Sequence, residues 1–180
     1  NKLYLPECSR LPDLVINDHS TDIPLNAELK LFSIDDALTT EIDDAFSIQT
    51  TGDGWIIGVH ISAPSLNPEL LSIASERLST VYYPGNKITM LPENVISHYS
   101  LDQGKQLPVV SIYFTIDREF TITNTESKLE QVLISDNLRT DNLEQYFNSE
   151  NLQLEHGYPY ESELKLLHKF ALKLEELRGR

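Results

Sequence analysis

The stretch SIDDALTTEIDDAFSI, residues 33–48, places five carboxylates within ten positions between two short apolar runs. No lysine or arginine occurs between Lys30 and Arg77, so the neighbouring sequence offers these acids no positive partner. Acids this close together either face water or share a cation, because like charges repel. The five are Asp35, Asp36, Glu41, Asp43 and Asp44.

Strand signals flank the acidic stretch on both sides. An apolar run from Leu29 predicts a buried strand that ends at Asp35. After the acids, AFSIQTTGDGWIIGVHIS contains two strand-like runs around Asp53-Gly54, a pair typical of a hairpin turn. Residues 33–62 therefore predict a strand, an acidic loop, a second strand, a turn and a third strand.

The rest of the chain adds helices and further strands. Residues 1–28 contain three prolines and are expected to form an extended lead-in. Asn67 and Pro68 have the residue types of a helix cap and first turn, and residues 109–124 predict two strands. From Tyr160 an amphipathic helix is expected, with one apolar face made by Leu164, Leu167, Ala171, Leu174 and Leu177. We expect an α/β (α+β) unit over 29–180, with a mixed β-sheet and covering helices.

Composition limits the partners. The formal net charge is -14, which argues against gripping nucleic acid or anionic membrane by bulk electrostatics. Cys8 is the only cysteine and no apolar run is long enough to cross a membrane. The start of the chain also lacks the pattern of a signal peptide. We therefore expect a soluble, cytoplasmic protein.

The acidic stretch has the donor chemistry of a magnesium site. Mg²⁺ prefers oxygen ligands, and metal ions at carboxylate sites activate water for attack on phosphodiesters. Asp43 and Asp44 are adjacent, so both reach one site only from a loop or bulge. An EF-hand calcium loop is excluded, because Ala37, Thr39 and Thr40 occupy positions that it reserves for ligands and glycine. Spacing alone favours a solvated acidic loop over a metal site, because runs of charged residues usually face water.

Several separated motifs together resemble the RNB catalytic domain of the ribonuclease II and ribonuclease R exoribonucleases. The family pattern T-I-D, a short gap and then D/E-x-D-D-A is similar to Ile34-Asp35 followed by residues 41–45. GWIIGVHISAPS and RLSTVYYPGNKITMLPENV resemble the next two family segments, in the same order, and YSLDQG resembles the one after. Glu41 stands where aspartate is more common, which adds a methylene of reach.

The resemblance implies a magnesium-dependent enzyme, with Mn²⁺ as an alternative ion, that degrades single-stranded RNA from the 3′ end to nucleoside monophosphates. It implies catalytic roles for Asp35, Glu41, Asp43 and Asp44, with Asp35, Asp43 and Asp44 as metal ligands. Tyr82 matches a family tyrosine that stacks on bases. Asp36 matches no catalytic position, and we interpret it as exposed or turn-forming.

His60 lies within an apolar strand-like run, where we expect a structural histidine. The resemblance covers only the first half of an RNB domain. We expect the later, arginine-containing half and the oligonucleotide-binding domains to be missing, and the isolated chain to be inactive. No membrane or DNA partner is expected. The alternative is a non-catalytic RNA-binding or protein-interaction relative.

Overall fold

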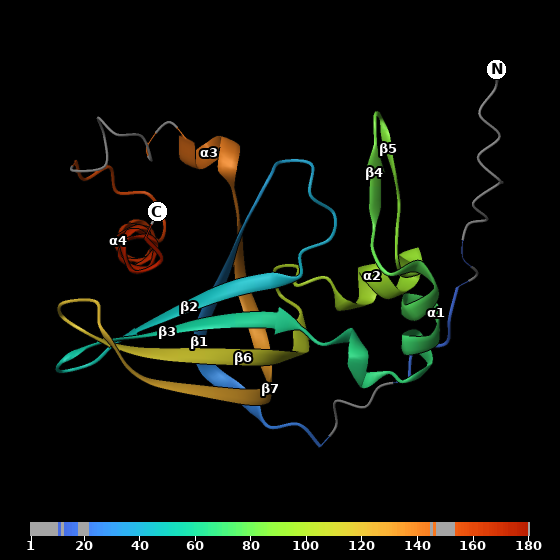
Figure 1. Ribbon diagram of the computed structural model, residues 1–180, viewed down its shortest axis with the longest axis horizontal. Helices are drawn as coiled ribbons and strands as arrows, with labels where there is room; N and C mark the ends of the chain where they lie inside the picture. The colour runs from blue at the N-terminus through green and yellow to red at the C-terminus, as the bar shows by residue number, and fades with distance from the viewer. Residues whose placement is uncertain (1–10, 12, 18–21, 145, 147–153, 180) are drawn as a thin grey trace.

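A closed five-stranded β-barrel forms the centre of the part of the chain that the structure describes (Figure 1). The computed structural model describes residues 11, 13–17, 22–144, 146 and 154–179. Neighbouring strands run antiparallel except β1 and β7, which close the barrel in parallel. In barrel order the strands are β1 (Leu25–Asp35), β2 (Asp44–Thr50), β3 (Gly54–Ser62), β6 (Gln106–Asp117) and β7 (Ile122–Arg139).

The barrel interior follows from the two-residue period of its strands, which sends alternate side chains inward. Its apolar part also includes Ile42 from the acidic stretch and Leu101 from the segment before β6. Both side chains are almost completely buried, so they fix these two connections to the barrel. The interior cluster comprises Leu29, Leu31, Ile42, Ala45, Leu101, Leu107, Val109, Tyr113, Val132 and Ile134.

A polar chain crosses the same interior. His60 is fully buried, with Nε2 2.8 Å from Ser47 Oγ and Nδ1 2.8 Å from Ser111 Oγ. Burial lowers the pKa of His60 to about 4, so the ring is neutral near pH 7. Buried Glu130 accepts hydrogen bonds from Tyr113 Oη and, at 3.0 Å, from Asn26 Nδ2. The prediction of a structural histidine is confirmed.

Helices cover the barrel on two sides (Figure 1). α4 (Glu161–Leu177) packs on its outer face, where Phe170 contacts Ile57 and Ile116, and Leu164 joins Phe32. Leu177, predicted to share the apolar face of this helix, is 73% exposed because α4 extends past the barrel contacts. The opposite side carries η1 (Pro64–Leu66), α1 (Glu69–Arg77) and α2 (Glu93–Tyr99), and α3 (Thr140–Glu144) follows β7.

A two-stranded hairpin, β4 (Val81–Tyr83) and β5 (Asn86–Ile88), projects from the side that carries α1 and α2 (Figure 1). The mixed sheet, the covering helices and the β2–β3 hairpin agree with the sequence prediction. β1 begins at Leu25, four residues before the apolar run that predicted it. α1 begins at Glu69, one residue later than Pro68 suggested, and Asn67 Oδ1 accepts from Glu69 N at 3.2 Å, as expected of a capping side chain. Most of the predicted lead-in lies outside the described residues.

Candidate active site

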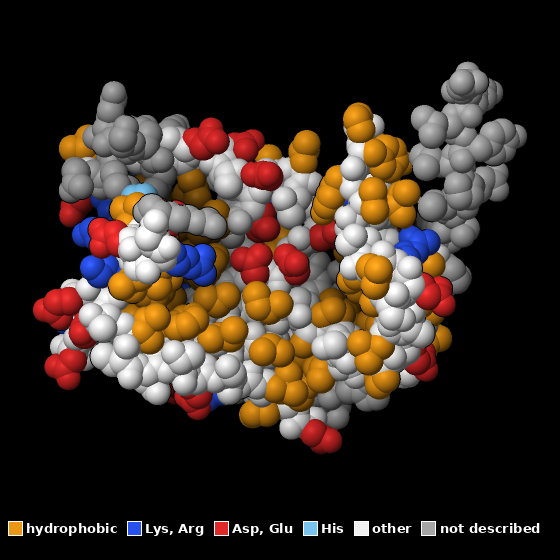
Figure 2. Space-filling model, viewed as in Figure 1, with side chains coloured by type: hydrophobic (Ala, Val, Ile, Leu, Met, Phe, Trp, Pro, Cys, Tyr) orange, Lys and Arg blue, Asp and Glu red, His pale blue; other side chains and the backbone are white. Residues whose placement is uncertain are grey.

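The acidic residues lie where β1 ends and β2 begins. Asp35 is the last residue of β1, Asp44 is the first of β2, and antiparallel pairing of these strands brings their ends together. Asp43 is the residue just before β2, so Asp43 and Asp44 straddle the junction of loop and strand. Figure 2 shows acidic side chains gathered on this face, beside the apolar side chains of the β4–β5 hairpin.

The pKa of Asp44 depends on two of the other carboxylates, those of Asp43 and Asp35. Burial raises the pKa of Asp44, and the negative charges of Asp43 and then Asp35 raise it further. Asp44 therefore lies close enough to both carboxylates for their negative charges to disfavour its ionised form. A bound cation would reverse this effect by favouring the ionised forms.

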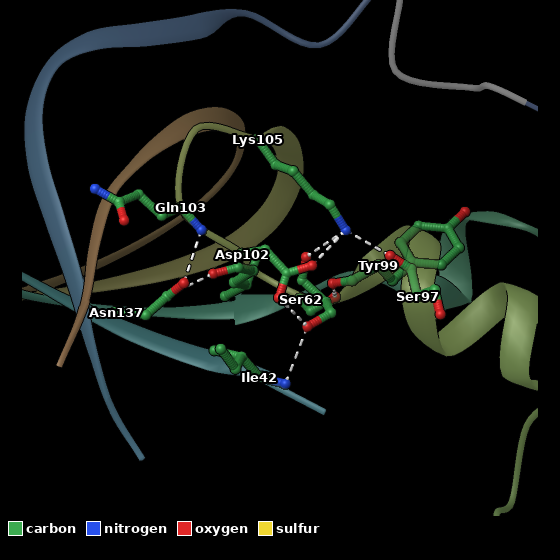
Figure 3. Close-up of polar contacts among 10 residues, drawn as sticks. Ile42, Ser62, Ser97, Tyr99, Asp102, Gln103, Lys105 and Asn137 are labelled. Carbon is green, nitrogen blue, oxygen red and sulfur yellow. Dashed lines mark hydrogen bonds and ion pairs between the residues drawn. The ribbon is translucent and has the colours of Figure 1, made fainter. Parts of the chain in front are cut away.

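Hydrogen bonds from β7 and the segment before β6 support Asp35. Ser33 Oγ donates to Asp35 Oδ2 at 2.6 Å, and Asn137 Nδ2 donates to Ser33 Oγ at 3.0 Å. Asn137 also donates to Leu101 O at 2.9 Å and accepts from Gln103 N at 2.7 Å, the second of which is drawn in Figure 3. Asp35 is therefore oriented by a side-chain relay that begins about 100 residues away in sequence.

The backbone around Asp43 is held from two sides. Ile42 N donates to Ser100 Oγ at 3.2 Å, and Leu101 N donates to Ile42 O at 2.8 Å. On the other side, Ser62 N donates to Asp43 O at 2.8 Å. Figure 3 shows Ile42 beside the segment that follows α2 and Ser62 beside the end of that helix, where Ser62 Oγ donates to Tyr99 O at 2.7 Å. These bonds fix the carboxylate-bearing backbone before any ligand binds.

An ion pair between Lys105 and Asp102 stabilises the segment that follows α2. Ser100 Oγ donates to Asp102 Oδ1 at 3.0 Å, and Lys105 Nζ lies 2.6 Å from Asp102 Oδ2. Lys105 also donates to Ser97 O at the C-terminal part of α2, where backbone carbonyls carry partial negative charge (Figure 3). The lysine thus joins α2 to the segment that holds Ile42.

Asp36 stands apart from the other acids. It is exposed, its backbone carbonyl accepts from Thr39 N at 3.0 Å in a turn, and its Oδ1 accepts from Thr140 Oγ1 at 3.0 Å. Arg139 also donates to Asp36 O at 3.0 Å. The interpretation of Asp36 as an exposed, turn-forming residue is confirmed.

The β4–β5 hairpin lies beside the acidic loop, with Tyr82 on β4 and Glu41 on the loop. Lys87 Nζ of β5 is 2.7 Å from Glu41 Oε1, so this acid already has a positive partner. Tyr82 of β4 is 72% exposed, so its ring is not part of the core. Tyr82 therefore presents its ring to solvent on the hairpin that contacts the acidic loop through Lys87.

A cavity of about 220 Å³ opens between the acids and the root of the hairpin. Glu41 and Asp43 contribute its polar rim, and its apolar wall includes Met90, Leu91 and Ile96. Ligand sites are mostly apolar clefts of about 300–1,000 Å³ with a few polar groups, so this cavity has the lining of such a site at a smaller size. A larger cavity of about 580 Å³ between α4 and the barrel is apolar, and none of Asp35, Asp43 and Asp44 lines it.

The donor set suits a hard cation, although its side chains do not converge as they stand. Among the described residues, no group of three or more His, Cys, Asp or Glu side chains is arranged to hold a metal ion. Asp35, Asp43 and Asp44 nevertheless supply only carboxylate oxygens, which are the donors that Mg²⁺ prefers. No helix in the described part of the chain could cross a membrane.

The RNB domain family matches residues 26–180. This chain belongs to the RNB domain family. Exoribonuclease 2 from Yersinia pestis (strain Pestoides F) is 32% identical over 124 residues, which cover 66% of this chain and 19% of the relative. This RNB chain therefore spans about a fifth of the length of that curated relative.

Solved structures share the fold. Mycoplasma genitalium RNase R in complex with ribose-methylated single-stranded RNA matches with a TM-score of 0.71 at 20% identity, over 91% of this chain and 26% of that one. Yeast Ssd1, described as a pseudonuclease, matches with a TM-score of 0.66 at 19% identity, over 83% of this chain and 19% of that one. Because an exoribonuclease and a pseudonuclease share this fold, the fold alone does not decide turnover.

The sequence did not predict the two basic residues that contact the acidic stretch, Lys87 and Arg139. Lys87 contacts Glu41, and Arg139 contacts two backbone carbonyls of the loop, at Asp36 and Thr39. Both lie beyond Arg77, outside the interval in which the sequence shows no positive charge. Only the placement of the β4–β5 hairpin and the parallel pairing of β1 with β7 bring them to the loop, and no local pattern signals either.

Proposed function

We propose that this RNB domain contributes the metal-binding carboxylates of a 3′-to-5′ exoribonuclease that hydrolyses single-stranded RNA to nucleoside monophosphates. The observation that carries the proposal is the grouping of Asp35, Asp43 and Asp44 on backbone that is already held in place. Membership of a family with exoribonuclease relatives supports the class of reaction.

In this proposal Asp35 and Asp44 bind Mg²⁺ directly, and Asp43 shapes the positions of the ion and its water. Mn²⁺ is an alternative ion. The metal supplies a water of lowered pKa and neutralises charge on the phosphodiester. Ser33 and Asn137 keep the Asp35 carboxylate oriented, and the hydrogen bonds at Ile42 and Asp43 keep the loop from reorganising.

The substrate chemistry follows from the hairpin and the cavity. Tyr82 stacks on a base, which is tolerant of sequence and suits a degrader of many RNAs. The cavity beside Glu41 and Asp43 receives the nucleotide at the 3′ end. Because the chain carries a net charge of -14, RNA binding needs basic surface from the remaining length that its relatives have.

The test compares Asp44→Asn with Asp36→Asn in the complete protein, by which we mean this chain joined to the remaining length of its relatives. Asp44→Asn is expected to reduce release of nucleoside monophosphates from single-stranded RNA by more than a hundredfold while RNA binding stays within twofold. Asp36→Asn changes one acid of the same loop but should keep full turnover, because its carboxylate bonds to Thr140. Robust turnover by Asp44→Asn would contradict the proposal.

A second candidate is an RNA-binding relative without turnover. The observation that favours it is the ion pair of Glu41 with Lys87, which engages one of the four acids that the resemblance assigns to catalysis. The same assay separates the two functions. The second candidate predicts that the complete protein binds single-stranded RNA but releases no monophosphate with either Mg²⁺ or Mn²⁺.

A further inference from the structure

The β4–β5 hairpin, residues 81–88, forms an arm beside the acidic connection, and its apolar side chains flank the acids in Figure 2. Tyr82 and Lys87 are directly opposite each other in the antiparallel register, so their side chains leave the same face of the arm. Because the two residues are paired across the strands, a contact that fixes Lys87 also fixes the backbone position of Tyr82.

Lys87 binds the acidic connection at two successive residues. Its Nζ lies 2.7 Å from Glu41 Oε1 and donates to Thr40 Oγ1 at 3.1 Å. The Lys87 side chain is 32% exposed and that of Glu41 is 23% exposed, so the pair is partly shielded from solvent. The longer glutamate side chain, where aspartate is more common in the family, spans the gap to the arm.

Other contacts hold the root of the arm. Met90 N donates to Thr80 Oγ1 at 3.2 Å, and Arg77 of α1 donates to Thr89 O at 2.8 Å. Both lie just outside the two strands, at the root of the arm. Lys87 is the middle residue of β5, so its contact with the acidic connection lies farther along the arm than either of these bonds.

We propose that Lys87 is a positioning residue that holds the arm, and with it Tyr82, against the acidic site through Glu41. The inference deepens the proposed function and rests on it for its consequence in catalysis. Glu41 then acts through the arm, while Asp35, Asp43 and Asp44 serve the metal. Loss of the contact loosens the grip on the RNA and leaves the chemical step unchanged.

The first test measures the arm directly, without RNA or metal. Spin labels at Leu38→Cys on the loop and Tyr83→Cys on the arm, in a Cys8→Ser background of this chain, report the distance between the two elements. Leu38 is 91% exposed, and Tyr83 leaves the face of the arm opposite to Lys87, so neither label disturbs the contact.

Lys87→Met should broaden the distance distribution and shift it to longer values. The charge exchange Lys87→Glu with Glu41→Lys should restore a narrow distribution. Lys173→Met is the matched control, because it removes another lysine–glutamate pair, with Glu176 of α4, and should change nothing. A distribution for Lys87→Met that matches the unsubstituted arm and loop overturns the proposal.

The second test is kinetic. In the complete protein, Lys87→Met should raise the KM for single-stranded RNA about two- to fivefold, the range expected of a partly exposed ion pair, with kcat within twofold. The charge exchange is not used in the kinetic test, because Glu41 is one of the acids that the resemblance assigns to catalysis. A fall in kcat at unchanged KM, or no change in either, overturns the positioning role. If Asp44→Asn keeps its turnover the proposed function fails, whereas the distance measurement still decides whether Lys87 holds the arm.

Discussion

Replacement of Gly58 by alanine tests the packing of the barrel interior. Gly58 lies on β3 between Ser47 of β2 and Tyr113 of β6. A Cβ at this position would lie 2.4 Å from Ser47 Oγ and 2.6 Å from His60 Nε2. The methyl group therefore fits only if the 2.8 Å contact between Ser47 and His60 opens.

The expected loss of stability follows from three contributions. Overpacking a tight interior costs about 1–3 kcal/mol, and a buried polar group without its partner costs about 1–3 kcal/mol. Alanine recovers about 0.5–1 kcal/mol, because it restricts the unfolded chain more than glycine does. The net expectation is a decrease of about 1–5 kcal/mol in the free energy of unfolding.

Urea unfolding of the chain, followed by circular dichroism, measures this difference. Gly52→Ala in the β2–β3 turn is the matched control, since a Cβ there meets nothing within 4 Å, and it should change stability by less than about 0.5 kcal/mol. Adding Ser47→Ala to Gly58→Ala removes one of the two clashing atoms, so the double variant should be more stable than additivity predicts. If Gly58→Ala unfolds within about 0.5 kcal/mol of the original chain, the close packing around His60 is refuted.

Two further predictions concern pH and the acidic loop. Burial lowers the pKa of His60 to about 4 from an unfolded value near 6.5, so between these pH values the unfolded state binds a proton that the folded state does not. The free energy of unfolding is therefore at its full value above pH 6.5 and should fall by about 3 kcal/mol towards pH 4. In urea unfolding over this pH range, His60→Gln should show a weaker dependence of stability on pH, and equal slopes for the two proteins would contradict this prediction. Ile42→Ala should destabilise the chain by about 2–4 kcal/mol, because the Ile42 side chain is only 2% exposed. Leu38→Ala is the control and should be nearly neutral, because Leu38 is 91% exposed. Equal effects of the two substitutions in thermal unfolding would refute the claim that Ile42 holds the acidic loop on the barrel.

Features that depend on neighbouring residues could be predicted from the sequence. The Asp53-Gly54 pair marks the β2–β3 hairpin, and the apolar run before Asp35 marks the end of β1. The heptad-like spacing of leucines after Tyr160 marks α4, although Phe170, which fills the barrel contact, was not among the residues expected to do so. These signals succeed because turn chemistry and side-chain periodicity act over a few residues.

Features that depend on distant pairing could not be predicted. The parallel contact of β1 with β7 closes the barrel by joining residues such as Asp35 and Arg139, which no local pattern connects. The same closure brings Asn137 behind Asp35 and Arg139 onto the loop. The partner of Glu41 likewise comes from the arm. The candidate acids were therefore identifiable from the sequence, but the side chains that orient and neutralise them were not.

The measurement that tests the central claim most directly is paramagnetic broadening of the NMR signals of this chain by Mn²⁺. If Asp35, Asp43 and Asp44 form a metal site, the amide signals of these residues should broaden first as the ion is added, and Asp44→Asn should weaken the effect at least tenfold. Asp36→Asn should leave it unchanged. Broadening that begins elsewhere on the chain, or that survives Asp44→Asn undiminished, would contradict the account.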